Sequence, residues 1–291
     1  MKMQPLAGLI VFLSLSSSTA FGGTIEISDA TFHNNPELIT NKFWRLFVGA
    51  TYGYRAITED ECEFNKLSVT NTTYQVEPEE GVFITTRVVR DQEWVTELDE
   101  AGDCDLDTAE LLEDTHDYYA QDDDGNIWYF GEETYAKEEE DDECEIVSDG
   151  SWEAGVPGEE GEPARAGIVM LADPQPGDRY QQEFLEGEAE DWGAVLRLNA
   201  LVSIELDDYD NCLVTKEWTP LEPGEVEHKY YCPSTGPYYG FTPGLVFIEE
   251  LKGKTVNVEF IGNGFIGNFP DNLPGDGDMD FPSDALACEE E

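Results

Sequence analysis

Three aspartates near the end of the chain are the residues best suited to binding a metal ion. Asp276, Asp278 and Asp280 alternate with other residues, and Gly277 separates the first two. Alternating carboxylates in a glycine-containing loop can direct several oxygens at one hard cation, and calcium favours such ligands. Phe281 stands where an EF-hand loop has glycine, so we expect a looser calcium loop here. A solvated acidic tail is the alternative interpretation.

A second acidic cluster lies in the middle of the chain. Asp122, Asp123 and Asp124 precede Gly125 and Asn126. Asp-Gly between two strand-like segments is a strong hairpin signal, because glycine adopts positive φ at little cost. A plain β-turn with solvated carboxylates is the interpretation this signal favours. A turn does not require three successive carboxylates, however, so Asp122, Asp123, Asp124 and Asn126 form our second candidate calcium site. Residues 138–145 and the group Asp103, Asp105 and Asp107 rank third.

The sequence offers no arrangement typical of catalysis. A nucleophile needs a base beside it, yet His33, His116 and His228 are scattered and no GxSxG motif is present. Paired carboxylates could in principle hydrolyse glycosides, but 65 acidic residues make any chosen pair uninformative. We therefore expect a protein that is not an enzyme.

The charge of the chain is extreme. With 65 acidic and 15 basic residues, the formal net charge is -50. Such a chain is repelled by nucleic acid and by anionic membranes, so we expect neither as a partner. It also repels itself unless cations or salt screen the charge. The acidity could serve calcium binding, or it could keep the protein solvated in a saline habitat.

The first residues resemble an export signal. Lys2 precedes an apolar stretch over residues 6–15, and small residues follow at positions 18–20. We expect a signal peptide at 1–20, with a cut after Gly22 as the alternative, and hence a secreted, extracellular protein. No later stretch reaches the length of about 20 apolar residues that spans a bilayer.

An even number of cysteines in an exported chain predicts three disulfides. The six are Cys62, Cys104, Cys144, Cys212, Cys232 and Cys288. If the turn between residues 211–218 and 226–232 is centred on Glu222, Val214 faces Tyr230 and Cys212 faces Cys232. Cys212–Cys232 is therefore our preferred pairing, because directly opposed side chains lie close.

The remaining cysteines leave alternatives open. Cys62 and Cys104 stand in acidic, loop-like stretches and could tie two loops together, with Cys144 competing for either. Cys288 is expected to anchor the end of the chain or to bond to another chain.

Strand patterns dominate the sequence. Residues 196–206 alternate strictly, with apolar residues at the even positions, which predicts a half-buried strand. Further expected strands are 51–57, 66–76, 82–90, 115–120, 126–131, 179–186, 211–218, 226–232, 245–251 and 254–260. Short helical turns could form at 110–113 and 189–194. Many strands separated by turns predict an all-β, antiparallel sandwich or barrel-like domain with long acidic loops.

The chain divides into four parts on this interpretation: the signal at 1–20, an N-terminal segment and connector at 21–50, the β domain at 51–261 and an acidic tail at 262–291. Residues 137–145 and 155–167 look irregular. Residues 24–27 could add a strand to the sheet of a neighbouring copy, or form a strand within their own domain.

Several stretches resemble a group of uncharacterised bacterial secreted proteins. The most specific is 117–132, DYYAQDDDGNIWYFGE; others are 150–155, 180–191, 213–224 and 226–231. The resemblance covers residues 51–251 and implies an extracellular β domain, without catalytic residues to transfer. Some proteins of this general kind form calcium-dependent extracellular filaments. The chain departs from the group in its acidic segments around Cys62, Cys104 and Cys144, and in its tail.

Together these features favour a secreted calcium-binding protein that self-associates, through calcium-bridged contacts, into an extracellular matrix or filament. The alternative is a monomeric binding protein for a lipid or a carbohydrate, with an acidic surface adapted to salt. Aromatic residues in the strands could line such a site, although strand aromatics are more often core.

Overall fold

Antiparallel β-strands make up almost all of the regular structure in this computed structural model. It describes residues 25–57, 61–99, 101–105, 108–140, 143–148, 150–158, 161–203, 208–224, 226–233, 242–249, 255–265 and 288. The elements are η1 (Ile27–Asp29), β1 (Ala50–Ile57), β2 (Glu61–Glu79), β3 (Val82–Glu97), β4 (Glu110–Gln121), β5 (Ile127–Glu140), β6 (Glu143–Val147), β7 (Trp152–Glu153), β8 (Arg165–Met170), β9 (Arg179–Gln181), β10 (Glu183–Phe184), β11 (Trp192–Ser203), β12 (Asp208–Trp218), β13 (Val226–Cys232), β14 (Thr242–Glu249) and β15 (Thr255–Phe265). In this described part, no helix is long and apolar enough to cross a membrane. The predicted all-β, antiparallel fold is confirmed.

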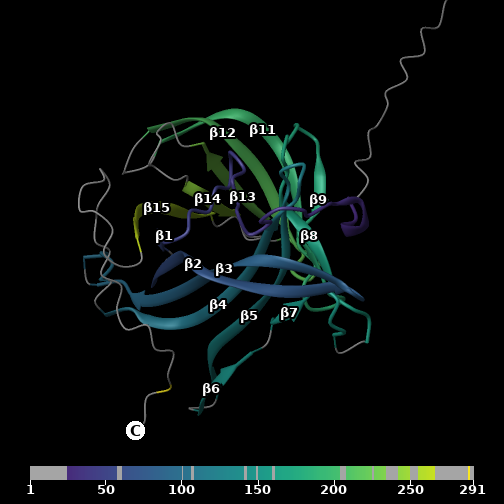
Figure 1. Cartoon of the computed structure of the whole chain (residues 1–291). Helices are drawn as coiled ribbons and strands as arrows, with labels where there is room; N and C mark the ends of the chain where they lie inside the picture. Colours follow the sequence, from purple (N-terminus) through teal and green to yellow (C-terminus); the bar gives the residue numbers. More distant parts are fainter. Residues whose placement is uncertain are drawn as a thin grey trace, which may run out of the picture.

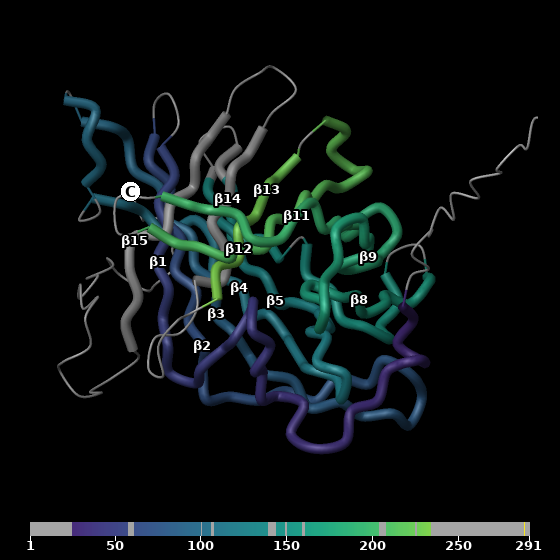
Figure 2. Tube along the Cα trace, turned by 90° about the horizontal axis from the view of Figure 1, so that it is seen from above, coloured from purple at the N-terminus to yellow at the C-terminus, as the bar shows by residue number. Residues whose placement is uncertain are grey.

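The strands form one curled sheet (Figure 1). Its order is β10-β8-β5-β4-β3-β2-β1-β15-β14-β13-β12-β11-β9, with β6 and β7 attached to β5. Residues 179–184 join the two ends of this sheet, because β9 pairs with β11 and β10 pairs with β8. Figure 2 shows β8 and β9 side by side at this junction. The sheet is therefore barrel-like, with an inner face that the strands surround.

Bulges supply the bending that this curl requires. The pairing register shifts between Gly53 and Tyr54 in β1 and between Glu93 and Trp94 in β3. β11 shifts three times against β12. An extra residue in one strand increases the local twist and bends it. One of these shifts falls between Val195 and Arg197, which explains why Leu196 is 45% exposed although alternation predicts it to be buried.

The N-terminal segment packs against the sheet. Phe32 contacts Trp128 and Phe130 with ring centroids 6.3 and 5.7 Å apart. Trp44 lies between Tyr119 of β4 and Tyr231 of β13, at 5.5 and 5.8 Å. This N-terminal segment therefore contributes to the core, where Ile39, Phe43 and Leu46 are buried.

Three local predictions are wrong. Residues 25–27 form no strand within their own domain, since Ile27 begins the short helix η1; Thr24 lies outside the described residues. Residues 110–113 belong to β4, and the expected helical turn near 189–194 is replaced by an isolated bridge at Ala189 and the start of β11. The acidic run at 137–145 is not irregular where the structure describes it, because β5 continues to Glu140 and pairs with β6, which begins at Glu143.

Three disulfides staple the sheet. Cys212–Cys232 joins β12 to β13, and Val214 pairs with Tyr230 as expected. Cys62–Cys104 ties β2 to the loop after β3, the second expected pairing. Cys144 of β6 pairs with Cys288, so the end of the chain is anchored within the same chain.

Candidate functional site

Asp122 folds the turn between β4 and β5. The Asn126 backbone N–H donates to its Oδ1 at 2.8 Å, and the Asn126 amide donates to its Oδ2 at 2.8 Å. The buried Trp128 indole N–H donates to the same oxygen at 2.9 Å. The Asn126 side-chain oxygen accepts the Ala172 backbone N–H. Asp122 and Asn126 therefore use their polar atoms to hold the turn, whose glycine, Gly125, has a positive φ of 97°.

The other two aspartates of this cluster point elsewhere. Asp123 accepts hydrogen bonds from the ring and the backbone N–H of His33, which fix the N-terminal segment to the turn. The hydrogen bond from the ring lowers the pKa of Asp123. Asp124 is exposed. Asp276, Asp278 and Asp280 lie outside the described residues. Within the described ranges, no three His, Cys, Asp or Glu side chains are placed to share one metal ion.

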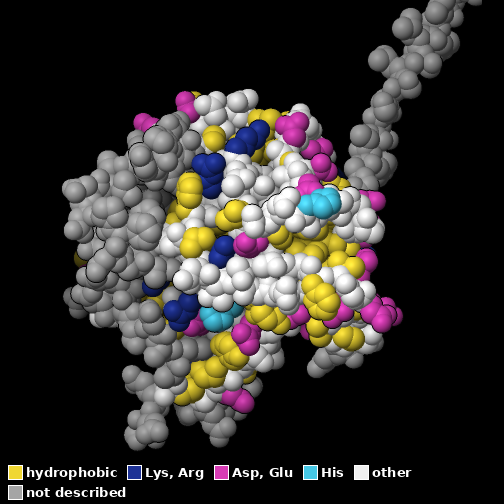
Figure 3. Space-filling view, in the orientation of Figure 1, with side chains coloured by type: hydrophobic (Ala, Val, Ile, Leu, Met, Phe, Trp, Pro, Cys, Tyr) yellow, Lys and Arg dark blue, Asp and Glu magenta, His cyan; other side chains and the backbone are white. Residues whose placement is uncertain are grey.

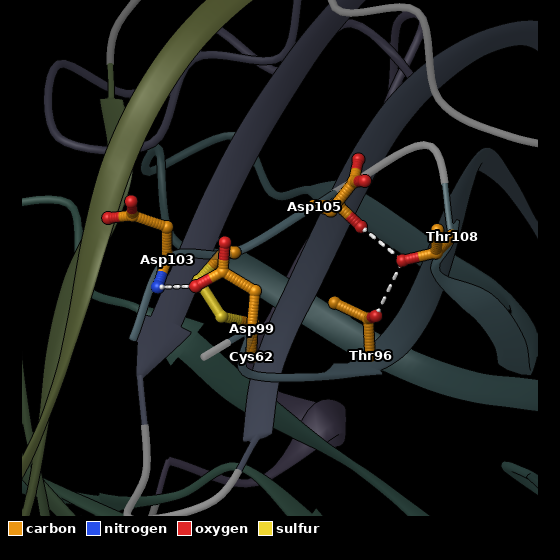
Figure 4. Close-up of a disulfide and its surroundings, with 7 residues drawn as sticks. Cys62, Thr96, Asp99, Asp103, Asp105 and Thr108 are labelled. Atoms are coloured by element: carbon orange, nitrogen blue, oxygen red, sulfur yellow. Dashed lines mark hydrogen bonds between the residues drawn. A yellow bond between two sulfur atoms is a disulfide. The ribbon is translucent and has the colours of Figure 1, made fainter. Parts of the chain in front are cut away.

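The loop behind the Cys62–Cys104 disulfide is organised by an aspartate that the sequence analysis did not single out (Figure 4). Asp99 Oδ1 accepts the backbone N–H groups of Ala101 and Asp103 at 2.7 and 2.9 Å. These hydrogen bonds lower the pKa of Asp99. Thr108 donates to the Asp105 carbonyl oxygen at 3.0 Å. Asp107 lies outside the described residues.

The acidic hairpin, defined here as residues 137–147, places glutamates opposite each other. In its register Glu138 faces Glu145, and Glu140 faces Glu143. The side chains of Glu138 and Glu145 are exposed. Like charges at directly opposed positions destabilise a strand pair, since their Cβ atoms are only about 5 Å apart. A cation held between them would remove this penalty. Figure 3 shows other acidic side chains scattered over one face, most of them toward its edges.

A further set of acids lies on the inner face of the sheet, and we call it the inner acidic patch. It comprises Asp91, Glu93, Glu113, Asp117 and Glu132, on β3, β4 and β5. Glu93 is opposite Glu113, and Asp117 is opposite Glu132. Asp91 stands two residues from Glu93 on the same face of β3. The register thus gathers five carboxyl groups on one side of three adjacent strands.

Burial changes the protonation of Asp91, Glu93, Asp117 and Glu132. It raises the pKa of Asp91, Glu93 and Glu132 to about 7, and neighbouring carboxylates add to the shift. Burial, followed by the charges of Asp91 and Glu132, raises the pKa of Asp117 well above its usual range. Carboxyl groups with strongly shifted pKa values are found often at functional sites, and also in structural networks of charged groups.

Tyr129 connects two members of the patch. Its hydroxyl lies 2.7 Å from Asp117 Oδ1 and 2.8 Å from Glu132 Oε2. The hydroxyl has one hydrogen, so it can donate fully to only one carboxylate. The two carboxyl groups therefore compete for one hydrogen. The hydrogen bonds from Tyr129 lower the pKa of both acids, but burial outweighs them and the pKa of each is raised.

The opposite wall carries its own compensated charges. Lys229 of β13 forms ion pairs with Glu217 at 2.9 Å and Glu227 at 3.1 Å. Glu217 also accepts hydrogen bonds from Tyr231, Gln182 and Thr215. Burial alone would raise the pKa of Glu217, but Lys229 and the hydrogen bonds from Gln182 and Thr215 bring it below its usual value.

The inner acidic patch was not predicted from the sequence, because alternating acids in a strand indicate a solvated face. The one available signal was that the same strands carry apolar or aromatic residues on both faces, such as Tyr118 and Tyr119 in β4, both buried. When both faces of a strand are buried, any acidic side chain on it is buried too.

Comparison with known proteins gives no relative. No family model, no curated protein and no solved structure matches this chain.

Proposed function

We propose that this chain is a secreted calcium-binding protein that self-associates into an extracellular matrix or filament. The acidic hairpin carries the proposal, because its facing glutamates leave a charge repulsion that a divalent cation would relieve. The three disulfides are compatible with an extracellular location. The pattern of residues 1–20 supports export.

The position of the hairpin supports association between copies. Among the described strands β6 pairs with β5 alone, so its second edge has no strand partner. Charged side chains on such an edge prevent it from pairing with another copy. Calcium bound by these glutamates would cancel the repulsion and bridge to carboxylates of a second copy.

The C-terminal aspartates join this argument through a covalent link. Asp276, Asp278 and Asp280 precede Cys288 in the sequence, and Cys288 is bonded to Cys144 of β6. The disulfide therefore links the stretch of sequence that ends at Cys288 to the strand that carries Glu145. We include Asp276, Asp278 and Asp280 among the proposed calcium ligands.

Replacing the exposed glutamate pair tests the proposal. We expect Glu138→Gln/Glu145→Gln to raise the calcium concentration needed for association by about tenfold or more, because two bridging ligands are lost. The control Glu186→Gln/Glu222→Gln removes the same charge from exposed positions elsewhere, and its calcium requirement should match that of the unmodified chain. Light scattering during a calcium titration at fixed ionic strength measures this. Equal calcium requirements for all three proteins would refute the role of the hairpin.

A further inference from the structure

Residues 38–57 contain no aspartate or glutamate, although 65 of the 291 residues of the chain are acidic. Lys42 and Arg45 stand in the same stretch, and we call residues 42–48 the basic loop. An isolated bridge between Thr40 and Arg45 closes this loop. A chain that is strongly negative as a whole therefore presents a segment of the opposite charge.

The cations of the basic loop face solvent. Lys42 and Arg45 are exposed, and neither forms an ion pair with a carboxylate in the described part of the chain. The Nζ atom of Lys42 lies 4.8 Å from the centre of the Phe43 ring. The guanidinium carbon of Arg45 lies 5.1 Å from the centre of the Phe47 ring, and both Phe47 and Val48 are exposed. Arginine beside exposed aromatic and apolar side chains is typical of surfaces that bind another protein.

The acidic hairpin carries the complementary charge. Residues 138–145 include seven acidic residues, and the basic residue of the hairpin, Lys137, forms an ion pair with Glu110 of β4. A bound calcium ion balances two carboxylates, so the hairpin stays negative after it has bound calcium. The cations of a basic loop from a second copy suit the charge that remains.

The basic loop and the acidic hairpin lie at opposite ends of β5. Asn41, next to the basic loop, donates from its side-chain amide to the carbonyl oxygen of Gly125 at 3.0 Å, just before β5 begins at Ile127. The acidic hairpin begins at the other end of β5, where Figure 1 shows β6 projecting from the rest of the sheet. The ten residues of strand from Ile127 to Lys137 span about 33 Å when extended. Each copy therefore carries the two opposite charges at well-separated places.

We propose that the basic loop of one copy docks on the acidic hairpin of the next copy. Its two cations meet the exposed glutamates Glu138 and Glu145, and its apolar side chains Phe47 and Val48 are covered in the contact. A contact between two different surfaces leaves one of each free at the ends of the pair, so further copies can add in a row. The contact rests on the proposed self-association, and it supplies the surface that the acidic hairpin meets.

Reversing the charge of the basic loop tests the contact in calcium. The control Arg165→Glu/Lys216→Glu reverses the same charge at two cations that also lie over aromatic rings, on β8 and β12. We expect Lys42→Glu/Arg45→Glu to need about tenfold more calcium for association than this control, because attraction at the contact becomes repulsion. Light scattering during a calcium titration at fixed ionic strength measures both requirements. Equal requirements would overturn the contact.

A charge swap tests the contact without calcium. Replacing the two facing glutamate pairs, Glu138→Lys/Glu145→Lys together with Glu140→Lys/Glu143→Lys, gives the hairpin an excess of positive charge. This hairpin variant and the loop variant each carry two surfaces of like charge, so each should stay monomeric alone in chelator. Their equimolar mixture pairs every loop with a hairpin of opposite charge. It should form complexes at a protein concentration about tenfold or more below that of either variant alone.

Sedimentation velocity measures these complexes, and circular dichroism of each variant alone shows that it is folded. Both variants keep a large negative net charge, so general attraction between them does not produce the expected result. A mixture that stays monomeric would overturn the contact, even if the unmodified chain associates in calcium. If the unmodified chain does not associate in calcium, calcium-driven association fails, and the mixture still decides whether the loop meets the hairpin.

Discussion

The folded protein is expected to lose stability as the pH rises from about 4 to about 8, because Asp91, Glu93 and Glu132 of the inner acidic patch must give up their protons in that range. Burial sets the pKa of Asp91, Glu93 and Glu132 at about 7, whereas such groups titrate near about 4 in an unfolded chain. Between these values the folded protein holds protons that the unfolded chain releases. The stabilisation is therefore complete below the unfolded pKa and is lost as the pH rises through the folded pKa. Each such group contributes about 1.4 kcal/mol per pH unit in this window.

Chemical denaturation at several pH values, in chelator and at fixed ionic strength, measures this loss. A variant is needed because the large net charge of the chain also weakens the fold as carboxylates ionise. Asp91→Asn/Glu93→Gln should flatten the dependence between about pH 5 and 7 and raise stability at about pH 8. Glu186→Gln/Glu222→Gln removes the same charge from the surface and should keep the original slope. Identical slopes for both variants would show that surface repulsion alone sets the pH response.

Asp122→Ala should destabilise the protein by about 3 kcal/mol, because it leaves the buried Trp128 indole N–H and the Asn126 amide without their acceptor. Asp124→Ala, at the neighbouring exposed position, should change stability by less than about 0.5 kcal/mol. The free energy of unfolding measures both effects.

Repeating the Asp122→Ala measurement in calcium and in chelator decides what the aspartate does. A turn residue gives the same loss in both conditions, and the hydrogen bonds of Asp122 predict this result. A loss confined to calcium-containing buffer would instead make Asp122 a calcium ligand.

The strands and one hairpin register could be predicted from the sequence because the signals are local. Cys212 and Cys232 are 20 residues apart around a single turn, so centring the turn on Glu222 aligned every pair across it. The pairing of Cys144 with Cys288 spans 144 residues, and no local pattern predicts a contact over that distance.

Other features escaped prediction because tertiary structure overrides a local rule. Opposed glutamates argue against a strand pair, yet the acidic hairpin forms as a continuation of β5, which is already fixed within the sheet. Leu196 follows the alternation of its strand but is exposed by a bulge. The inner acidic patch depends on which face of β3, β4 and β5 turns inward, and only the curl of the whole sheet decides that.

The most direct test of calcium-driven association is light scattering, with negative-stain imaging, on the chain without residues 1–20. The protein is compared in millimolar calcium and after chelation, at matched ionic strength, with magnesium as a second control. We expect ordered assemblies that grow in calcium, dissolve on chelation and do not form in magnesium or sodium. A protein that stays monomeric in all of these conditions would contradict the proposal that calcium drives its assembly.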